Sequence, residues 1–498
     1  MLESDPVIDE AAGTASNPGS SAFDGHDPPD PALIDKCVHC GFCLPSCPTY
    51  VLWGEEMDSP RGRIYLMKMG LDGRTAMTPA FVRHFDTCLG CMACVTACPS
   101  GVQYSPLIEA TRGQIDRRHP RSWADRLFRA AIFSIFPYPR RLRIALAPLA
   151  LWTSISDRWS PVGGSSRRHE GNEEHEGDQK LRALRGSSSL RDEPLHIDRQ
   201  LMSRVRAMLA LAPRVTWKSL IARVPARTPA IGVRRMSVGL LAGCVQRLVF
   251  PNVNAATVNV LSAEGCDVLA PRDQGCCGAL ALHAGRLDDA RRFARKTIAA
   301  FERAAVDVIA VNAAGCGSSM KEYGHLLADD PRWSERARAF AARVRDVNEL
   351  VAALGPPVAP RHPIALRVAY QDACHLAHAQ GIRQQPRDLL RSIPGLEVLP
   401  LAEADICCGS AGIYNLVEPE TAQQLGDRKI RFIDAVKPDV IATANPGCTL
   451  QLRAAAVRLG REWAIRHPIE ILDDSIRGTA SQPVVKVQRR TEGGEAPR

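Results

Sequence analysis

Between residues 236 and 476, short apolar runs alternate with longer stretches in which apolar residues recur every three or four positions. The short runs predict strands, and the longer stretches predict amphipathic helices. Alternation of this kind is typical of a parallel sheet with helices on its faces. The predicted strands are 237–242, 266–270 and 307–312 in the first half, and 365–370, 396–400 and 439–443 in the second half.

The cysteines of this region form an internal repeat. The first half contains Cys244, Cys276, Cys277 and Cys316, and the second contains Cys374, Cys407, Cys408 and Cys448, at offsets of 130 to 132 residues. Both pairs of adjacent cysteines are followed by glycine, and VDVIAVNAAGC (306–316) matches PDVIATANPGC (438–448). We infer two copies of one domain, 236–356 and 357–476. Because the cysteines follow predicted strands, each set of four should converge at the carboxyl edge of its sheet.

The rest of the chain is more polar or more interrupted. Residues 31–110 carry eight further cysteines, and SPRGRIYLMKMG (59–70) within them predicts a helix. The remaining segments are predicted as a disordered acidic leader (1–30), short basic and apolar helices broken by prolines (111–153), a polar linker (154–200), a helical connector (201–235) and a disordered tail (477–498).

The composition is that of an ordinary globular protein, with 498 residues of which 45% are hydrophobic and 23% charged. No apolar run is long enough to predict a membrane-spanning helix. Residues 1–30 contain seven acidic residues and no Lys or Arg, which is unlike a secretory signal. We therefore expect the chain in the cytoplasm, with a peripheral position at the inner face of the cytoplasmic membrane as a further expectation. There its 17 cysteines would stay reduced, which indicates metal or redox chemistry rather than disulfides.

The net charge of +9 is carried almost entirely by arginine, since only nine of the 63 basic residues are Lys. The densest basic stretch is 112–143, with nine Arg. A nucleic-acid binder would concentrate its charge on one face or tail, so no nucleic-acid partner is expected. The stretch suits acidic lipid head groups or an acidic partner subunit, and solvated short helices explain it equally well.

Two cysteine motifs in the N-terminal region share the spacing C-x2-C-x2-C-x3-C-P. Three cysteines spaced by two residues let one loop hold three corners of a cubane, and the fourth reaches the other cluster. The predicted assignment is therefore crossed, and Gly41 and Gly90 would let the backbone approach the inorganic sulfurs. One [4Fe–4S] cluster would be held by Cys37, Cys40, Cys43 and Cys98, and the other by Cys88, Cys91, Cys94 and Cys47.

Cysteines in these patterns can also serve other chemistry. A pair of zinc sites fits two runs of four cysteines poorly, because zinc favours separated C-x2-C pairs. The repeat cysteines could hold further metal centres, or they could be reduced thiols lining a duplicated cleft. Cys266, which has no counterpart, is predicted to be a core residue. His375 and His378 could be ligands or proton carriers near a quinone, although capping or packing explains them as well.

No strand–helix G-x-G-x-x-G or P-loop motif is found, so the chain contains electron-transfer centres but no evident two-electron catalyst. Taken together, CVHCGFCLPSCPTY, DSPRGRIYLMK, CLGCMACVTACPSGVQY and the two Cys-Cys-Gly repeats resemble the iron–sulfur subunit of glycolate oxidase. The resemblance covers residues 31–476, with a poor fit at 154–200. It implies an α+β multidomain architecture, a helix-rich ferredoxin domain for two [4Fe–4S] clusters followed by a duplicated α/β parallel-sheet domain.

The resemblance also implies partners. A separate FAD subunit, with a second flavoprotein-like subunit, would oxidise glycolate to glyoxylate, and this chain would pass the electrons to quinone or another membrane acceptor. Alternatives are the iron–sulfur subunit of a lactate or glycerol-3-phosphate dehydrogenase, a heterodisulfide-reductase-like enzyme, and a redox-sensing cluster protein. The heterodisulfide pattern ends each repeat in C-x-x-C, whereas this chain has Ser319 and Gln451 at the last positions. That departure favours the glycolate-type function.

Overall fold

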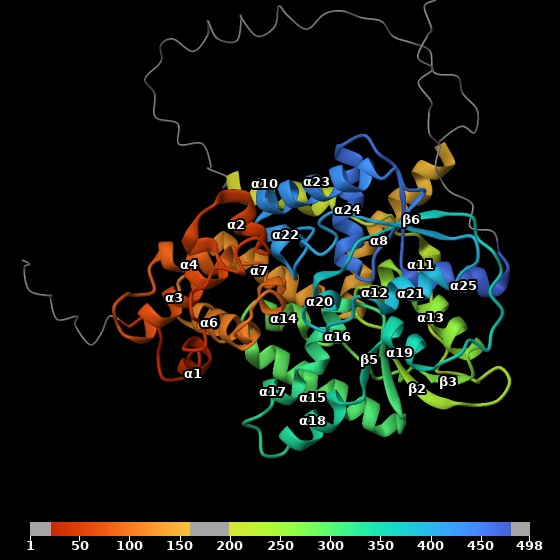
Figure 1. Cartoon of the computed structure of the whole chain (residues 1–498), viewed down its shortest axis with the longest axis horizontal. Helices are drawn as coiled ribbons and strands as arrows, with labels where there is room; N and C mark the ends of the chain where they lie inside the picture. The colour runs from red at the N-terminus through yellow and green to blue at the C-terminus, as the bar shows by residue number, and fades with distance from the viewer. Residues whose placement is uncertain (1–20, 160–198, 480–498) are drawn as a thin grey trace, which may run out of the picture.

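The computed structural model describes residues 21–159 and 199–479. The parts of the predicted leader, linker and tail at 1–20, 160–198 and 480–498 lie outside these residues. In Figure 1 the N-terminal helices gather at one end of the molecule, and the two repeats make up the other end. The fold is thus a helix-rich N-terminal region followed by two α/β units with mainly parallel sheets, as the sequence predicts.

Short helices separated by cysteine-containing loops make up the N-terminal region. Most begin at a proline, whose missing N–H costs nothing in the first turn. Side chains cap several of them: Ser59 accepts a hydrogen bond from the Gly62 amide (3.1 Å). The elements are α1 (Pro31–Ile34), α2 (Pro48–Trp53), η1 (Glu56–Asp58), α3 (Pro60–Leu71), α4 (Pro79–Asp86), α5 (Ala93–Thr96) and α6 (Tyr104–Arg118).

The end of the predicted disordered leader is ordered, which corrects that prediction for residues 21–30. Phe23 is buried against Phe81, with ring centroids 5.9 Å apart. Gln114 of α6 accepts from the Asp24 amide and donates to the Asp24 carboxylate. The polar composition concealed this packing because one alanine and one phenylalanine supply the buried surface.

The predicted short helices of 111–153 are also longer than expected. Helix α6 crosses the expected boundary at residue 110, and α8 (Pro139–Trp159) continues through Pro148 and past residue 153. Proline removes one helical hydrogen bond. Leu146 and Leu149 pack in a hydrophobic cluster with residues that lie later in the chain, and this packing offsets the lost hydrogen bond. The other helices between the two halves of the molecule are α7 (Trp123–Ile135), α10 (Arg199–Ala210) and α11 (Trp217–Ile221).

The first repeat has a five-stranded sheet of order β1-β3-β2-β4-β5, in which only β1 is antiparallel. Central strand β2 places Val238 between Val268 and Val308. Its strands are β1 (Arg227–Thr228), β2 (Met236–Leu241), β3 (Cys266–Leu269), β4 (Val308–Val311) and β5 (Val344–Asp346). Its helices are α12 (Gln246–Val249), α13 (Pro251–Ala263), α14 (Ala279–His283), α15 (Leu287–Ala304), α16 (Ala314–Lys321), α17 (Tyr323–Leu326), α18 (Ser334–Ala341) and α19 (Val347–Ala353).

The second repeat has a fully parallel sheet of order β7-β6-β8-β9. Its strands are β6 (Arg367–Tyr370), β7 (Glu397–Leu399), β8 (Val440–Ala442) and β9 (Ala464–Arg466). Its helices are α20 (Cys374–Ala377), α21 (Gln385–Arg391), α22 (Tyr414–Val417), α23 (Pro419–Ala435), α24 (Pro446–Arg458) and α25 (Pro468–Arg477). All six strands expected from the sequence are present in the two sheets.

The two repeats meet at the starts of α16 and α24, the helices that carry their last cysteines. The Ala314 amide donates to the Ala444 carbonyl (3.1 Å), and the Gly315 amide donates to Asn445 Oδ1 (3.2 Å). One hydrophobic core includes Val260 of the first repeat and Tyr370 of the second. The carboxyl edges of the two sheets therefore approach each other. Within the described ranges, no helix combines the length and apolar character that crossing a bilayer would require.

Candidate iron–sulfur centres

The eight N-terminal cysteines lie in two loops that fold against each other. Cys37, Cys40 and Cys43 occupy the loop between α1 and α2, and Cys47 is the N-cap residue of α2. Cys88 and Cys91 follow α4, Cys94 lies in α5, and Cys98 follows it. Short helices thus enclose both loops and fix where each sulfur lies.

Two cavities collect these cysteines in the crossed combination. One cavity is lined by Cys37, Cys40, Cys43 and Cys98. The other is lined by Cys88, Cys91, Cys94 and Cys47. Cys94 also lines the first cavity, so the two are neighbours. Each cavity offers the four thiols that a [4Fe–4S] cluster requires, and the residues present fit one such cluster in each.

The backbone of the two loops is matched residue by residue. His39 (φ 54°) and Gly90 (φ 64°) precede the second cysteine of each motif, and Gly41 (φ 85°) and Met92 (φ 61°) follow it. Both loops therefore need left-handed backbone at the same two positions, and each fills one of them with glycine. Because the backbone conformations match, the two cysteine loops curve around their cavities in the same way.

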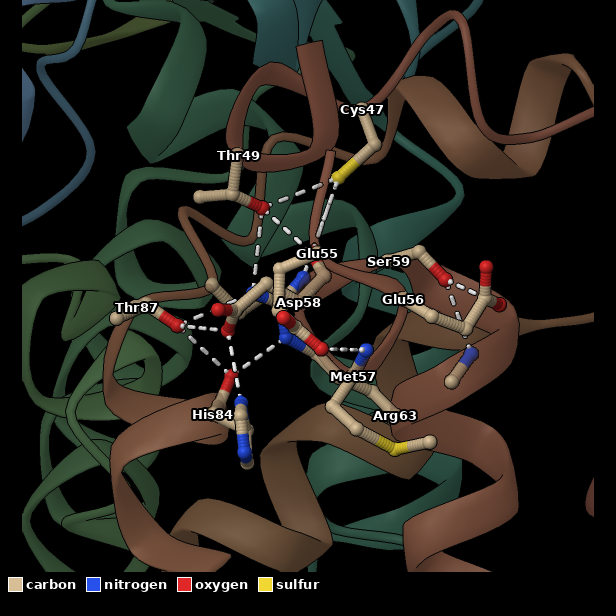
Figure 2. A network of polar contacts seen from close by, with 12 residues as sticks. Cys47, Thr49, Glu55, Glu56, Met57, Asp58, Ser59, Arg63, His84 and Thr87 are labelled. Carbon is tan, nitrogen blue, oxygen red and sulfur yellow. Dashed lines mark hydrogen bonds and ion pairs between the residues drawn. The ribbon is translucent and has the colours of Figure 1, made fainter. Parts of the chain in front are cut away.

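A buried arginine lines the second cavity beside Cys47 (Figure 2). Arg63 is 1% exposed, and its guanidinium donates to Cys47 Sγ (3.9 Å), Thr87 Oγ1 (3.1 Å) and Asp58 Oδ1 (3.3 Å). Burial opposes its positive charge, but the negative charges of Cys88, Tyr104, Cys47 and Asp58 outweigh burial and raise its pKa. This cation can offset the negative charge that four thiolates bring to the site.

Asp58 holds that arginine in place. Its Oδ1 also accepts from Thr87 Oγ1 (2.8 Å) and contacts His84 Nδ1 (3.1 Å), and its carbonyl accepts from Thr49 Oγ1 (2.7 Å). Figure 2 shows these groups converging on one point beside Cys47. The network joins η1, α3, α4 and the start of α2, so one buried ion pair orders four elements around the cavity.

A second arginine of the same helix serves the first cavity. Arg61 lines that cavity, donates to the His39 carbonyl (3.1 Å) and pairs with Glu56 through Nε (2.6 Å). Between them lies Gly62, where a Cβ would come within 2.0 Å of the Glu56 carbonyl oxygen. The pattern of SPRGRIYLMKMG (59–70) predicts a helix but not this function of its arginines. The signal for it is two arginines, two positions apart, in a segment between the two cysteine motifs.

In the first repeat, the four predicted cysteines lie together at the carboxyl edge of the sheet. Cys244 Sγ donates to Cys276 Sγ (3.5 Å), and the Gly278 amide donates to Cys276 Sγ (3.4 Å). Hydrogen bonds from Cys276 and Cys316 hold the pKa of Cys277 well below its ordinary value. The edge therefore presents one sulfur that favours the thiolate, surrounded by thiols that donate to it.

The second repeat has a similar arrangement with two sulfurs of this kind. Cys374 Sγ lies 3.9 Å from Cys407 Sγ, and hydrogen bonds hold the pKa of Cys374 (from Cys407) and of Cys408 (from Cys407 and Cys448) well below their ordinary values. In the described part of the chain, no three His, Cys, Asp or Glu side chains are close enough to share a single metal ion. Metal binding by the repeat cysteines thus stays a prediction.

The second set of repeat cysteines lies against the N-terminal region. Cys374 and Cys407 belong to the same buried core cluster as Cys91 and the flanking Leu89 and Ala93. The repeat fold therefore brings its sulfurs next to the cysteine loop of the second cavity. The first cavity with Cys37, the second cavity with Cys88 and the second repeat with Cys374 therefore follow one another in space as they do along the chain.

The histidines after Cys374 have different positions. His378 is a contact between domains, since its Nδ1 meets Thr96 Oγ1 (2.7 Å) and its Nε2 meets the Asp405 carbonyl (3.0 Å). His375 stacks on His283 of the first repeat, with ring centroids 4.7 Å apart and an interplanar angle of 19°. Cys266 lies fully buried in β3, apart from both sets, as a core residue would.

The positions that distinguish heterodisulfide-type repeats lie in helices. Ser319 is buried in α16, and Gln451 is buried in α24. Gln451 Nε2 donates to the Ala422 carbonyl (2.7 Å), and its Oε1 accepts from Asn415 (3.2 Å). Gln451 thus ties three segments of the second repeat together, where the other pattern has a further thiol.

Comparison with protein families divides the chain as its geometry does. Residues 33–102 match the 4Fe-4S dicluster domain, and residues 238–321 and 368–453 each match the cysteine-rich CCG domain. Residues 124–154 match the linker region of the glycolate oxidase iron-sulfur subunit. The linker match falls on α7 and α8, the helices between the cysteine loops and the repeats.

Curated relatives match over most of the chain. It is similar to the probable glycolate oxidase iron-sulfur subunit of Bacillus subtilis, at 38% identity over 88% of this chain and 92% of that one. The glycolate oxidase iron-sulfur subunit of Escherichia coli is 33% identical over 89% of this chain and 95% of its own length. Lactate utilization protein A of Geobacillus thermodenitrificans is 30% identical over 48% of this chain and 99% of its own length.

Proposed function

The chain belongs to the family of glycolate oxidase iron–sulfur subunits, and on that premise we propose that it carries electrons from a partner's flavin to a membrane acceptor. The observation that carries the proposal is the pair of adjacent four-cysteine cavities, with a further cysteine set packed against the second cavity. Adjacent one-electron centres suit a relay, because a reduced flavin holds two electrons that must leave singly.

The ligands are proposed in the crossed sets that line the cavities. Cys37, Cys40, Cys43 and Cys98 hold one [4Fe–4S] cluster, and Cys88, Cys91, Cys94 and Cys47 hold the other. Arg61 stands beside the first and Arg63 beside the second. Electrons leaving the second site meet Cys374 and Cys407 next, since those residues pack against Cys91.

The substrate chemistry is proposed for a separate FAD subunit, accompanied by a second flavoprotein-like subunit. Oxidation of glycolate to glyoxylate releases two electrons and two protons, and the electrons pass to this chain. A lactate-oxidising complex is the second candidate, because lactate utilization protein A aligns over its whole length with about half of this chain. Quinone is the proposed acceptor in either case.

A peripheral membrane position is proposed for the linker helices. Among the described residues, α7 and α8 expose Trp123, Leu127, Ile144 and Trp152, each at more than 60%. The same stretch carries exposed Arg140 and Arg141. Aromatic and aliphatic side chains together with arginine are typical of helices that lie in the interface of an anionic membrane.

Substitution of one proposed ligand tests the relay. Cys43→Ser in the intact complex should abolish the EPR signal of one cluster and stop reduction of the acceptor. The partner's flavin should still bleach with glycolate or lactate, because substrate oxidation occurs on another subunit. Iron analysis of the anaerobically purified wild-type chain should give about eight irons from the two N-terminal clusters.

Cys266→Ala is the matched control, since it removes the one cysteine outside both sets. It should keep the iron content and acceptor reduction. Loss of flavin bleaching in an intact Cys43→Ser complex would overturn the relay function, and iron content of four or bound zinc would overturn the cluster assignment. Comparing glycolate with lactate as reductant distinguishes the two candidate substrates.

A further inference from the structure

A large apolar cavity separates the linker helices from the cysteines of the first repeat. Its volume is about 440 Å³, which lies within the roughly 300–1,000 Å³ of ordinary small-molecule sites. Linker residues Ile132, Ile135, Leu142, Leu146 and Leu149 form much of its wall. The volume is sufficient for a ligand with a ring-sized head, and the apolar linker wall suits a hydrocarbon part.

The inner end of the cavity is polar. Cys244, Cys276, Cys277 and Cys316 line it, so a ligand there would lie directly against the first cysteine set. His375 also lines it, is 6% exposed, and has an Nε2 atom without a hydrogen-bond partner. Unsatisfied polar atoms are costly when buried, which indicates a ligand that completes them.

Two further buried polar atoms in this cavity have no hydrogen-bond partner. His283 Nε2 and Gln246 Oε1 line the same cavity and lack partners, and His283 stacks on His375. None of the described lining residues is Lys, Arg, Asp or Glu. Apart from its histidines, the site therefore offers no cation to a carboxylate or phosphate head, and the unpartnered histidine nitrogens can donate to carbonyl oxygens.

The outer end opens between the linker helices. Ala131 of α7 and Ala145 of α8 line the cavity and are exposed. These two helices also carry the exposed tryptophans and arginines proposed to meet the membrane. A lipid-dissolved molecule could enter from that side without crossing the polar surface of the protein.

We propose that this cavity binds a quinone, with its ring at the cysteine end near His283 and His375 and its isoprenoid tail between α7 and α8. The inference rests on the proposed function and adds to it the place where the acceptor binds. Reduction of the quinone to the quinol takes two electrons, supplied singly by the chain's iron–sulfur centres, and two protons from water. The reductant is the hydroxy acid oxidised on the partner.

Blocking the entrance tests the proposal. In Ala145→Trp, the indole would fill the mouth of the cavity from an exposed position, so the fold should be kept. Ile144→Trp is the matched control, because Ile144 is 75% exposed on the same helix and does not line the cavity. Binding of a quinone analogue with a ten-carbon tail is measured by titration calorimetry on the purified full complex, without substrate.

Ala145→Trp should weaken this binding by about tenfold or more, which is about 1.4 kcal/mol or more, and Ile144→Trp should leave it unchanged. His283→Phe, which keeps the stacked ring and removes the polar atom, should also weaken it. A light-activated azidoquinone should label peptides of α8 or α14. Equal binding by all variants, labelling elsewhere, or displacement by a fatty acid as readily as by quinone would each overturn the site.

Ferricyanide separates this inference from the proposed function. As a water-soluble acceptor it should be reduced by the Ala145→Trp complex at the wild-type rate with the hydroxy acid as donor. If the wild-type complex fails to reduce ferricyanide, the relay function is wrong. If it succeeds while the quinone analogue fails to bind in the cavity, only the cavity assignment is wrong.

Discussion

Arg63 shows how a single residue sets the environment of the second cavity. A guanidinium buried to this extent is stable only when paired, and its partners are a carboxylate, two hydroxyls, a backbone carbonyl and a cysteine sulfur. Arg61 makes a more exposed pair with Glu56, which is worth less because water screens it. Helix α3 thus supplies a buried, tightly paired arginine (Arg63) to the second cavity and a more exposed, loosely paired arginine (Arg61) to the first cavity.

Arg63→Gln should therefore affect the second cluster selectively. Loss of the cation leaves Asp58 buried without its partner, which should cost about 3–5 kcal/mol of folding stability. It also makes each added electron less favourable, so the reduction potential of that cluster should fall. A redox titration followed by EPR measures the potential, and chemical denaturation measures the stability.

Arg61→Gln is the matched control for this experiment. It should lower the potential of the first cluster only, and its stability loss should be about 1 kcal/mol or less. Equal shifts of both clusters in either variant would contradict the assignment of one arginine to each cavity.

At the residue scale, the cysteines were predictable and the arginines were not. The positions of Cys37, Cys40 and Cys43 follow from spacing within one loop, which a sequence displays directly. The approach of Arg63 to Cys47 and Cys88 depends on how α3 packs across two loops, so no local pattern reports it. His39 and Met92 illustrate the same limit, since neither residue type signals left-handed backbone.

At the scale of elements, burial decided most of what the sequence could predict. Five of the six predicted strands are largely buried and β7 is the exception, whereas the missed strands β1 and β9 contain no buried residue and the missed strand β5 alternates around a half-buried arginine. β5 and β9 are in fact counterparts. Each leads into a helix through a capping box, Asp346 with Glu349 and His467 with Glu470. The duplication thus extends to a fourth strand and its helix.

The capping histidine of α25 should make the second repeat sensitive to acid. His467 is buried, its Nδ1 accepts from the Ile469 amide (3.1 Å), and burial lowers its pKa to about 3. Because the folded-state pKa lies below the unfolded value of about 6.5, the stabilisation is complete above pH 6.5 and is lost as pH falls towards 3. The loss should approach about 1.4 kcal/mol for each pH unit below 6.5.

His467→Asn tests this contribution. Asparagine is a good N-cap and does not titrate, so the variant should lose less stability than the wild type between pH 7.5 and pH 5. The measurement is the urea midpoint at a series of pH values. Parallel curves for the two proteins would contradict a buried neutral His467 as the source of the acid sensitivity.

At the scale of the whole molecule, the relay depends on how the N-terminal region docks onto the repeats. Helix α6 makes this contact with the first repeat. Arg112 donates to the Cys88 carbonyl in the second cysteine loop and to the His283 carbonyl (2.9 Å) at the end of α14. One side chain therefore joins the cluster loop to the histidine that lines the apolar cavity. The duplicated sheets were predictable from the sequence, but this docking was not, because it joins residues 171 positions apart.

The closest approach in this contact is at Gly285. A Cβ there would lie 2.2 Å from the Arg112 carbonyl oxygen, which is backbone and cannot move aside. Gly232 has a similar left-handed backbone, with φ of 77° against 81°, but nothing lies within 4 Å of its Cβ position. Both glycines thus adopt left-handed backbone, but only at Gly285 does a neighbouring backbone also leave no room for a Cβ.

The losses of folding stability in Gly285→Ala and Gly232→Ala should therefore differ only by the cost of the close contact at Gly285. Both should lose about 1–2 kcal/mol from left-handed backbone at a residue with a Cβ. Gly285→Ala should lose a further 1–3 kcal/mol, roughly, because α6 must shift away from the first repeat. Amide exchange of α6 should quicken in Gly285→Ala only, and its quinone reduction should slow while flavin bleaching by substrate stays fast. If both variants lost the same stability and kept the same exchange, the close packing of α6 on the first repeat would not hold the two halves together.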